Sequence, residues 1–167
     1  MEIEYRSFDR KKERYRYILE QAERILDEAG TEVAAMANLS ATLKLLMPRV
    51  NWAGFYLARG DGLSLGPFQG KPAVSSIKTG MGVCGTALAT LSPQVVGDVH
   101  CCENHIACDL SSRSEIVVPI VTDGGIYGVL DIDSPDRENF DTEDLEGLTA
   151  LCALFARFID ARAVGNK

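Results

Sequence analysis

Apolar residues recur at helical spacing near both ends of the chain, and between these segments they form short clustered runs. Residues 10–47 and 141–163 show the helical pattern, with an apolar residue at every third or fourth position. Gly30 interrupts the first segment, which therefore predicts two helices. The residues that we expect to face inward are Tyr15, Ile18, Leu19, Ala22, Ile25 and Leu26 in the first helix, Val33, Met36, Leu43 and Leu46 in the second, and Leu145, Leu148, Leu151, Cys152, Phe155, Phe158 and Ile159 in the last.

Residues that commonly begin or end helices mark the limits of these three helices. Asp9 and Asp141 precede the first and the last helix, and each can accept hydrogen bonds from free backbone N–H groups there. Thr31 restarts the chain into the second helix, and Pro48 ends it.

The middle of the chain, residues 51–133, predicts a sheet and the loops that could carry function. Two pairs of short apolar runs are each joined by a turn rich in glycine and aspartate, which is typical of β-hairpins. The predicted strands are 52–57, 63–68, 115–121 and 126–132, with shorter strands at 72–77 and 94–99 and a short helix at 82–91. Because strands joined by hairpins are antiparallel, we expect one α+β domain over residues 1–167, with an antiparallel central sheet and the terminal helices packed on one face.

Composition narrows the class of protein. The 167 residues carry a formal net charge of −7 and are 46% hydrophobic, which is typical of a globular domain and argues against a nucleic-acid partner. The chain has neither an apolar run long enough for a membrane span nor a signal peptide, so we expect no membrane partner. Five cysteines at irregular spacing do not predict a secreted disulfide framework, and we expect a cytoplasmic protein. The apolar terminal helices predict either a homodimer or packing within one subunit.

Two cysteines lie in segments that favour reactive thiols. Cys84 stands between glycines at the start of the short helix, where backbone amides predict a thiolate that forms at lower pH than in free cysteine. The alternative for Cys84 is a small buried residue at a tight turn. Cys108 lies in an irregular segment, 100–113, three residues after His105. His105 would either assist thiolate formation or tie the segment down by hydrogen bonds.

The same irregular segment offers a second interpretation, a metal site. Cys101 and Cys102 lie with His100, His105 and Cys108 within nine residues, and all five are ligands that zinc accepts. However, the segment has no Cys-x-x-Cys pair, and zinc sites usually draw on two pieces of chain rather than one. We therefore expect no metal here.

Three carboxylates and three aromatic residues complete the candidate site. Asp131 and Asp133 alternate on one strand, so both side chains lie on the same face, where a ligand ammonium would offset their repulsion; otherwise they lie at a strand end in water. Glu115 opens an apolar strand, where desolvation favours its protonated form and lets it donate a proton. Trp52, Phe55 and Tyr56 could wall an apolar slot or simply belong to the core.

Taken together, these segments resemble one enzyme family, the free methionine-(R)-sulfoxide reductases, which are stand-alone GAF-domain proteins. The resemblance covers nearly the whole chain, and the ordered set of motifs is specific although each motif alone is weak. The motifs are NWAGFY at 51–56, LGPFQGKPA at 65–73, GVCGTA at 82–87, DVH at 98–100, HIACD at 105–109, SEIVVP at 114–119 and GVLDIDSP at 128–135.

The resemblance implies a GAF fold and a thiol-dependent reduction of free methionine sulfoxide. A cysteine thiolate attacks the sulfoxide sulfur and becomes a sulfenic acid, a second cysteine forms a disulfide with it, and thioredoxin reduces that disulfide. No metal or organic cofactor is implied. The implied roles are nucleophile for Cys108, acid at the sulfoxide oxygen for Glu115, ammonium binding for Asp131 and Asp133, and an aromatic wall around the methyl end for Trp52 and Tyr56.

The chain departs from the family pattern at its other thiols. Val74 occupies a position where the family usually has a cysteine, which in some members resolves the sulfenic acid. We expect Cys84 to resolve Cys108 instead, with Cys102 or Cys101 as a substitute, or with thioredoxin or glutathione attacking the sulfenic acid directly. The competing functions are a non-catalytic GAF sensor of a small ligand and a Cys/His metal-binding module; turnover of methionine sulfoxide would distinguish the enzyme from both.

Overall fold

The computed structural model describes residues 3–101 and 111–165. Along the chain, the elements are α1 (Lys11–Glu28), α2 (Glu32–Leu46), β1 (Trp52–Arg59), β2 (Gly62–Gln69), β3 (Ser76–Lys78), α3 (Gly82–Thr90), β4 (Gln94–Val96), the 3₁₀ turn η1 (Val99–Cys101), β5 (Ser114–Thr122), β6 (Gly125–Ser134) and α4 (Thr142–Gly165). Among these residues, no helix is both long and apolar enough to cross a membrane.

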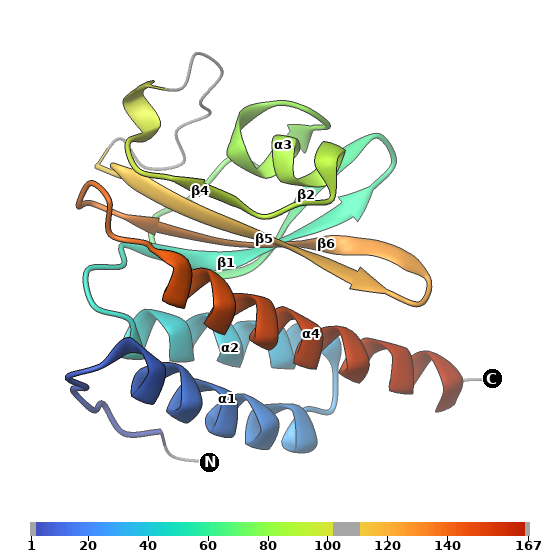
Figure 1. Cartoon of the computed structure of the whole chain (residues 1–167). Helices are drawn as coiled ribbons and strands as arrows, with labels where there is room; N and C mark the ends of the chain where they lie inside the picture. The colour runs from blue at the N-terminus through green and yellow to red at the C-terminus, as the bar shows by residue number, and fades with distance from the viewer. Residues whose placement is uncertain (1–2, 102–110, 166–167) are drawn as a thin grey trace.

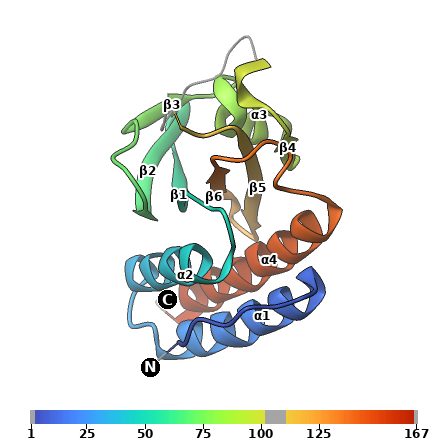
Figure 2. The same cartoon turned by 90° about the vertical axis from the view of Figure 1, so that its left-hand side faces the viewer.

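One six-stranded sheet organises the molecule, with the strand order β3-β2-β1-β6-β5-β4 and antiparallel pairing between all neighbours. Helices α2 and α4 pack on one face of the sheet, α1 lies beneath them, and the short α3 lies on the opposite face (Figures 1 and 2). The prediction of an α+β domain with an antiparallel sheet and the terminal helices on one face is therefore confirmed.

Two apolar cores lie on the two faces of the sheet. The larger one joins the three long helices to the sheet and includes most of the residues predicted to face inward, among them Ile18, Leu43 and Phe155. The smaller one lies between the sheet and α3. Val33 was wrongly predicted to face inward: it is 63% exposed, because the buried stripe of α2 follows Ala35, Met36, Leu39 and Leu43 instead.

The helix ends follow two of the three predicted caps. The Thr31 hydroxyl oxygen accepts a hydrogen bond from the Ala34 N–H at 3.1 Å. At α4 the capping is reciprocal, since Asp141 Oδ1 accepts from the backbone N–H of Glu143 at 2.9 Å and Asp144 Oδ2 accepts from that of Asp141 at 2.9 Å. Asp9 was the wrong choice for α1, because the helix starts one residue later, with Arg10 at the cap position and no side-chain cap bond.

Two predicted strands are shorter than the sequence pattern suggested. Of residues 72–77, only the last two join β3 (Ser76–Lys78); just before the strand, the Ser75 carbonyl accepts a hydrogen bond from the Leu65 N–H at 3.0 Å. Of residues 94–99, only 94–96 form β4, because the Gly97 carbonyl instead accepts from the Glu138 N–H at 2.9 Å, beyond β6.

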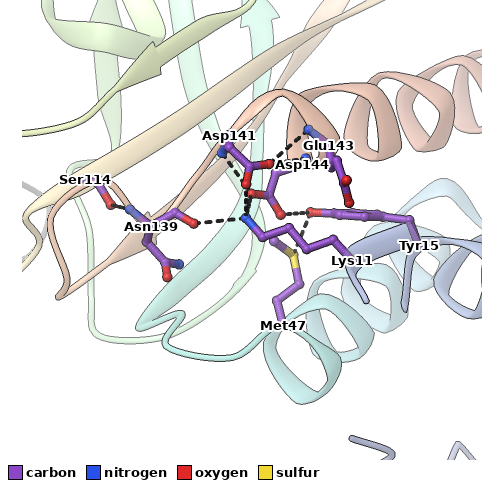
Figure 3. A network of polar contacts seen from close by, with 8 residues as sticks. All are labelled: Lys11, Tyr15, Met47, Ser114, Asn139, Asp141, Glu143 and Asp144. Carbon is purple, nitrogen blue, oxygen red and sulfur yellow. Dashed lines mark hydrogen bonds and ion pairs between the residues drawn. The ribbon is translucent and has the colours of Figure 1, made fainter. Parts of the chain in front are cut away.

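A polar network joins the first helix to the last (Figure 3). The Lys11 ammonium contacts both Asp141, at 2.8 Å, and Asp144, while the Tyr15 hydroxyl donates to Asp144 Oδ1 at 2.9 Å. Lys11 also donates to the Asn139 carbonyl at 3.4 Å. Burial alone would lower the pKa of Lys11, but its hydrogen bonds and ion pairs with the two aspartates outweigh burial and raise it. This network fastens the starts of α1 and α4 together.

We predict that Asp144→Ala destabilises the protein by about 2–4 kcal/mol, because it removes a 98% buried acceptor and leaves Lys11 and Tyr15 without it. Urea unfolding would measure the change. Glu146→Ala, an exposed position on the same helix, is the matched control and should alter stability by less than about 0.5 kcal/mol. Equal losses in the two variants would contradict a stabilising role for the network.

Candidate active site

Strand register brings the three predicted carboxylates together. In the pairing of β5 with β6, Glu115 lies opposite Asp133, and Asp131 lies two residues along β6 on the same face. All three are buried, with exposures of 6% for Glu115, 2% for Asp131 and 4% for Asp133. The strand-end alternative, in which the two aspartates lie in water, is therefore wrong.

Helix α3 adds a thiol to this carboxylate cluster. Cys84 is 3% exposed, and its Sγ donates to Glu115 Oε1 at 3.9 Å. The donor atoms of Cys84, Glu115 and Asp131 all lie within 4.8 Å of one another. These three side chains come from α3, β5 and β6, so only the folded chain forms the cluster.

The glycines that flank Cys84 allow this close approach. Gly82 adopts φ +63°, a left-handed conformation that disfavours other residues. A Cβ on Gly85 would lie 2.4 Å from the Lys78 carbonyl oxygen, so only glycine lets α3 approach β3 this closely. The Gly-Val-Cys-Gly sequence therefore seats the thiol against the sheet.

The electrostatics of Cys84 differ from the sequence prediction. Burial, followed by the charges of Asp131 and Glu115, raises the pKa of the Cys84 thiol well above its ordinary value. The prediction of a thiolate that forms at lower pH was wrong, because three carboxylates and the loss of water outweigh the amides at the start of α3. Cys84 is therefore a protonated thiol at neutral pH.

Asp131 is the least satisfied carboxylate of the cluster. Burial raises its pKa to about 7, and hydrogen bonding with Cys84 and Glu115 offsets part of that effect. Its Oδ1 atom is buried and accepts no hydrogen bond from any residue that the structure describes. A carboxyl group of this kind is protonated in part of the molecules at neutral pH, and it favours a ligand that can donate to it.

Two of the three predicted aromatic residues adjoin the cluster, whereas Phe55 lies in the larger core, on the helix side of the sheet. Trp52 and Tyr56 lie on β1 on the same face as Asp131 and are 1% and 0% exposed, with ring centroids 5.9 Å apart. The Trp52 Nε1–H donates to the Lys71 carbonyl at 3.1 Å, and the Tyr56 hydroxyl donates to the Val74 carbonyl at 3.0 Å. The segment around Val74 is therefore held over the same small core that contains Cys84.

Two contributors to this wall were not singled out from the sequence. Phe68 on β2 stacks on Trp52 with ring centroids 5.2 Å apart. Gly54 lies opposite Asp131, and a Cβ there would lie 2.3 Å from Phe68 Cβ and 2.7 Å from the Trp52 ring. A glycine within an otherwise apolar strand was the available signal, since it often marks a close approach.

The predicted nucleophile lies outside the described residues. Cys108, Cys102 and His105 fall in 102–110, and of Cys101 only the backbone is described. The described chain on either side of this segment converges at the start of β5, where the Val99 N–H donates to the Arg113 carbonyl at 2.8 Å. The Asn51 side-chain amide donates to Ser112 Oγ at 3.0 Å. The described residues Val99 and Arg113, which flank this segment, therefore lie side by side near the start of β5.

Comparisons with known proteins identify the class of protein to which this chain belongs. The family model of the GAF domain matches residues 21–159, so the chain is a GAF-domain protein. It is 52% identical to the free methionine-R-sulfoxide reductase of Escherichia coli over 121 residues, which covers 72% of this chain and 73% of the relative. It is 42% identical to the free methionine-R-sulfoxide reductase of Saccharomyces cerevisiae over 160 residues, covering 91% and 89%.

A solved structure of a protein with the same name as these two relatives is also similar to this chain. The X-ray structure of the Neisseria meningitidis free methionine-R-sulfoxide reductase in complex with its substrate superposes with a TM-score of 0.90 at 40% identity, covering 98% of each chain. The chain therefore belongs to the free methionine-R-sulfoxide reductases, a family of oxidoreductases.

We predict that Asp131 makes the protein less stable as the pH rises from about 4 to about 7. The carboxyl group keeps its proton in the folded state up to a pKa of about 7 but loses it near 3.8 when unfolded. Its contribution is thus fully present below the unfolded pKa and is lost as the pH passes the folded pKa, for a total of up to about 4 kcal/mol.

Urea unfolding of Asp131→Asn across this pH range would test the assignment, because the amide cannot titrate and the slope should flatten. Asp123→Asn, at an exposed carboxylate in the β5–β6 turn, serves as the control and should keep the wild-type slope. A wild-type slope in Asp131→Asn would show that another group is responsible.

Proposed function

We propose that this protein reduces free L-methionine-(R)-sulfoxide to L-methionine, with Cys108 as the nucleophile and thioredoxin or another dithiol as the reductant. The observation that carries the proposal is the buried cluster of Cys84, Glu115, Asp131 and Asp133 against an aromatic wall, in a chain 52% identical to a named reductase of this substrate. No metal or organic cofactor takes part in the reaction.

The substrate's ammonium group would bind between Asp131 and Asp133. The buried Asp131 Oδ1 has no described hydrogen-bond donor, so an ammonium supplies both a donor and a positive charge at the place where the carboxylates repel each other. The rings of Trp52 and Tyr56 would contact the methyl end. Backbone amides at the start of α3 would contribute to binding the substrate carboxylate.

The chemical step transfers the oxygen from the substrate to the enzyme. The Cys108 thiolate attacks the sulfoxide sulfur, Glu115 donates a proton to the oxygen as the S–O bond weakens, and the oxygen passes to the cysteine sulfur. Methionine sulfoxide and the thiol become methionine and a sulfenic acid, so the substrate sulfur is reduced and the cysteine sulfur is oxidised.

Cys84 would then resolve the sulfenic acid. Glu115, left without its proton, lies 3.9 Å from Cys84 Sγ and can accept the thiol proton, which generates the thiolate that attacks Cys108. The products are a disulfide and one molecule of water, and an external dithiol restores both thiols. If Cys84 does not resolve the sulfenic acid, Cys102 or Cys101 would take its place. We further propose a cytoplasmic location. The apolar faces of the terminal helices pack within one subunit, so these faces do not by themselves favour the homodimer, which stays a prediction.

Cys108→Ser should abolish methionine release from free methionine-(R)-sulfoxide, by ~10³-fold or more, with either dithiothreitol or thioredoxin as reductant. The reason is that serine cannot accept the oxygen as a sulfenic acid. Methionine formation would be measured by amino-acid analysis. Cys152→Ser is the control, because Cys152 lies in the helix-side core and takes no part in the site. Turnover in Cys108→Ser would refute the assignment of the nucleophile.

Cys84→Ser should keep turnover with dithiothreitol, which attacks a sulfenic acid directly, but lose it with thioredoxin. The comparison of the two reductants separates resolution from the first chemical step. Quantifying disulfide after one turnover provides a second readout. If Cys84→Ser still forms a complete intramolecular disulfide, then Cys102 or Cys101 is the resolving thiol.

Substrate binding should change the fluorescence of Trp52, the only tryptophan in the chain. Titration of Cys108→Ser with free methionine sulfoxide would give the affinity, and adding Asp131→Asn should weaken binding by roughly 10- to 100-fold, since a buried charged hydrogen bond is lost. N-acetylmethionine sulfoxide has no ammonium and should not bind. Equal binding of the two ligands would contradict the role of the aspartates.

A further inference from the structure

The cluster of Cys84, Glu115 and Asp131 has the composition of a transition-metal site. One sulfur and two carboxylate oxygens lie within 4.8 Å of one another, and all three residues are more than nine-tenths buried. Zn²⁺ accepts this combination of thiolate and carboxylate ligands. Two carboxylates and a thiolate also supply enough negative charge to stabilise a dication away from water.

A second observation points to a ligand at this place. Asp131 is 2% exposed, its Oδ1 has no hydrogen-bond partner among residues 3–101 and 111–165, and its carboxylate belongs to the cluster itself. A buried oxygen of this kind has lost its water without gaining a donor, which costs free energy until a cation or a donor occupies the space beside it.

The distances are close to those of an occupied site. Around a tetrahedral zinc ion, a thiolate sulfur and a carboxylate oxygen lie about 3.5 Å apart, and two carboxylate oxygens about 3.3 Å apart. The Cys84 Sγ to Glu115 Oε1 distance is 3.9 Å, and no pair exceeds 4.8 Å. Small side-chain rotations would therefore close the set around an ion, without a change in the backbone.

We propose that the reduced protein binds one Zn²⁺ ion through the Cys84 thiolate and the carboxylates of Glu115 and Asp131, with the fourth position open. Binding releases the thiol proton to solvent. This site is distinct from any that the cysteines and histidines of 100–108 could form, because its ligands come from α3, β5 and β6.

Zinc bound at this site would inhibit the enzyme. The ion occupies Asp131, where the substrate ammonium would bind, and Glu115, which would protonate the sulfoxide; this consequence rests on the proposed function, whereas metal binding itself does not. A disulfide at Cys84 removes the thiolate, so zinc would bind only the reduced form.

Titration with Co²⁺ would test the site, because cobalt bound to a thiolate gives a charge-transfer absorption in the near ultraviolet and visible bands typical of tetrahedral geometry. The protein would be reduced, freed of reductant and carry Cys101→Ser, Cys102→Ser and Cys108→Ser, so that the thiols of residues 101–108 cannot contribute. We expect one equivalent to bind and Zn²⁺ to displace it.

In that background, Cys84→Ser should abolish the charge-transfer absorption, and Asp131→Asn should weaken Co²⁺ binding by roughly 100-fold. Cys152→Ser, which alters the other buried thiol of the described residues, should leave both unchanged. Circular dichroism would confirm that each variant is folded. Absence of the absorption before Cys84 is changed, or its persistence afterwards, would overturn the proposal.

Competition with free methionine sulfoxide separates the metal site from the proposed function. In the same variant, which lacks the three thiols of residues 101–108, added sulfoxide should displace Co²⁺ and remove the absorption. If sulfoxide does not displace the bound cobalt, the metal site is upheld but its inhibition of the enzyme is overturned. If sulfoxide changes Trp52 fluorescence and yet no Co²⁺ binds, the substrate pocket stands and the metal site is refuted.

Discussion

The position of β6 at the centre of the sheet is the constraint on which the site depends. β6 pairs with β1 on one side and with β5 on the other, and its alternation places Asp131 and Asp133 on the α3 face and Leu130 and Ile132 in the helix-side core. A shift in register by one residue would exchange these two sets and put the carboxylates among apolar side chains. The apolar half of the strand therefore holds the acidic half in place.

Burying several ionisable groups on one face of a sheet is unfavourable, and the opposite face offsets that cost. Three long helices cover the helix-side core, and the network around Lys11 and Asp144 joins two of them. Burial of these groups also changes their chemistry. Loss of water keeps a proton on Cys84 and raises the pKa of Asp131 to about 7, so the site holds protons and an unsatisfied acceptor near neutral pH. Such a site would bind either the ammonium group of a substrate or a dication.

Local patterns predicted the parts of the structure that depend on neighbours in the sequence. The two hairpins follow from turn residues between apolar runs, and the Thr31 and Asp141 caps follow from side chains that bond to the next few amides. The shared face of Asp131 and Asp133 follows from the two-residue period of a strand. Local reasoning misplaced the start of the first helix, which begins after Arg10 rather than after Asp9.

By itself, the sequence determined the order of the elements, the antiparallel sheet, the family and which residue types could react, because these depend on local spacing and on ordered motifs. Tertiary structure alone decided that Glu115 lies opposite Asp133, that α3 seats Cys84 against both Glu115 and Asp131, and that Cys84 is a protonated thiol. The physical reason is that burial and charge at a residue are set by segments distant in the chain.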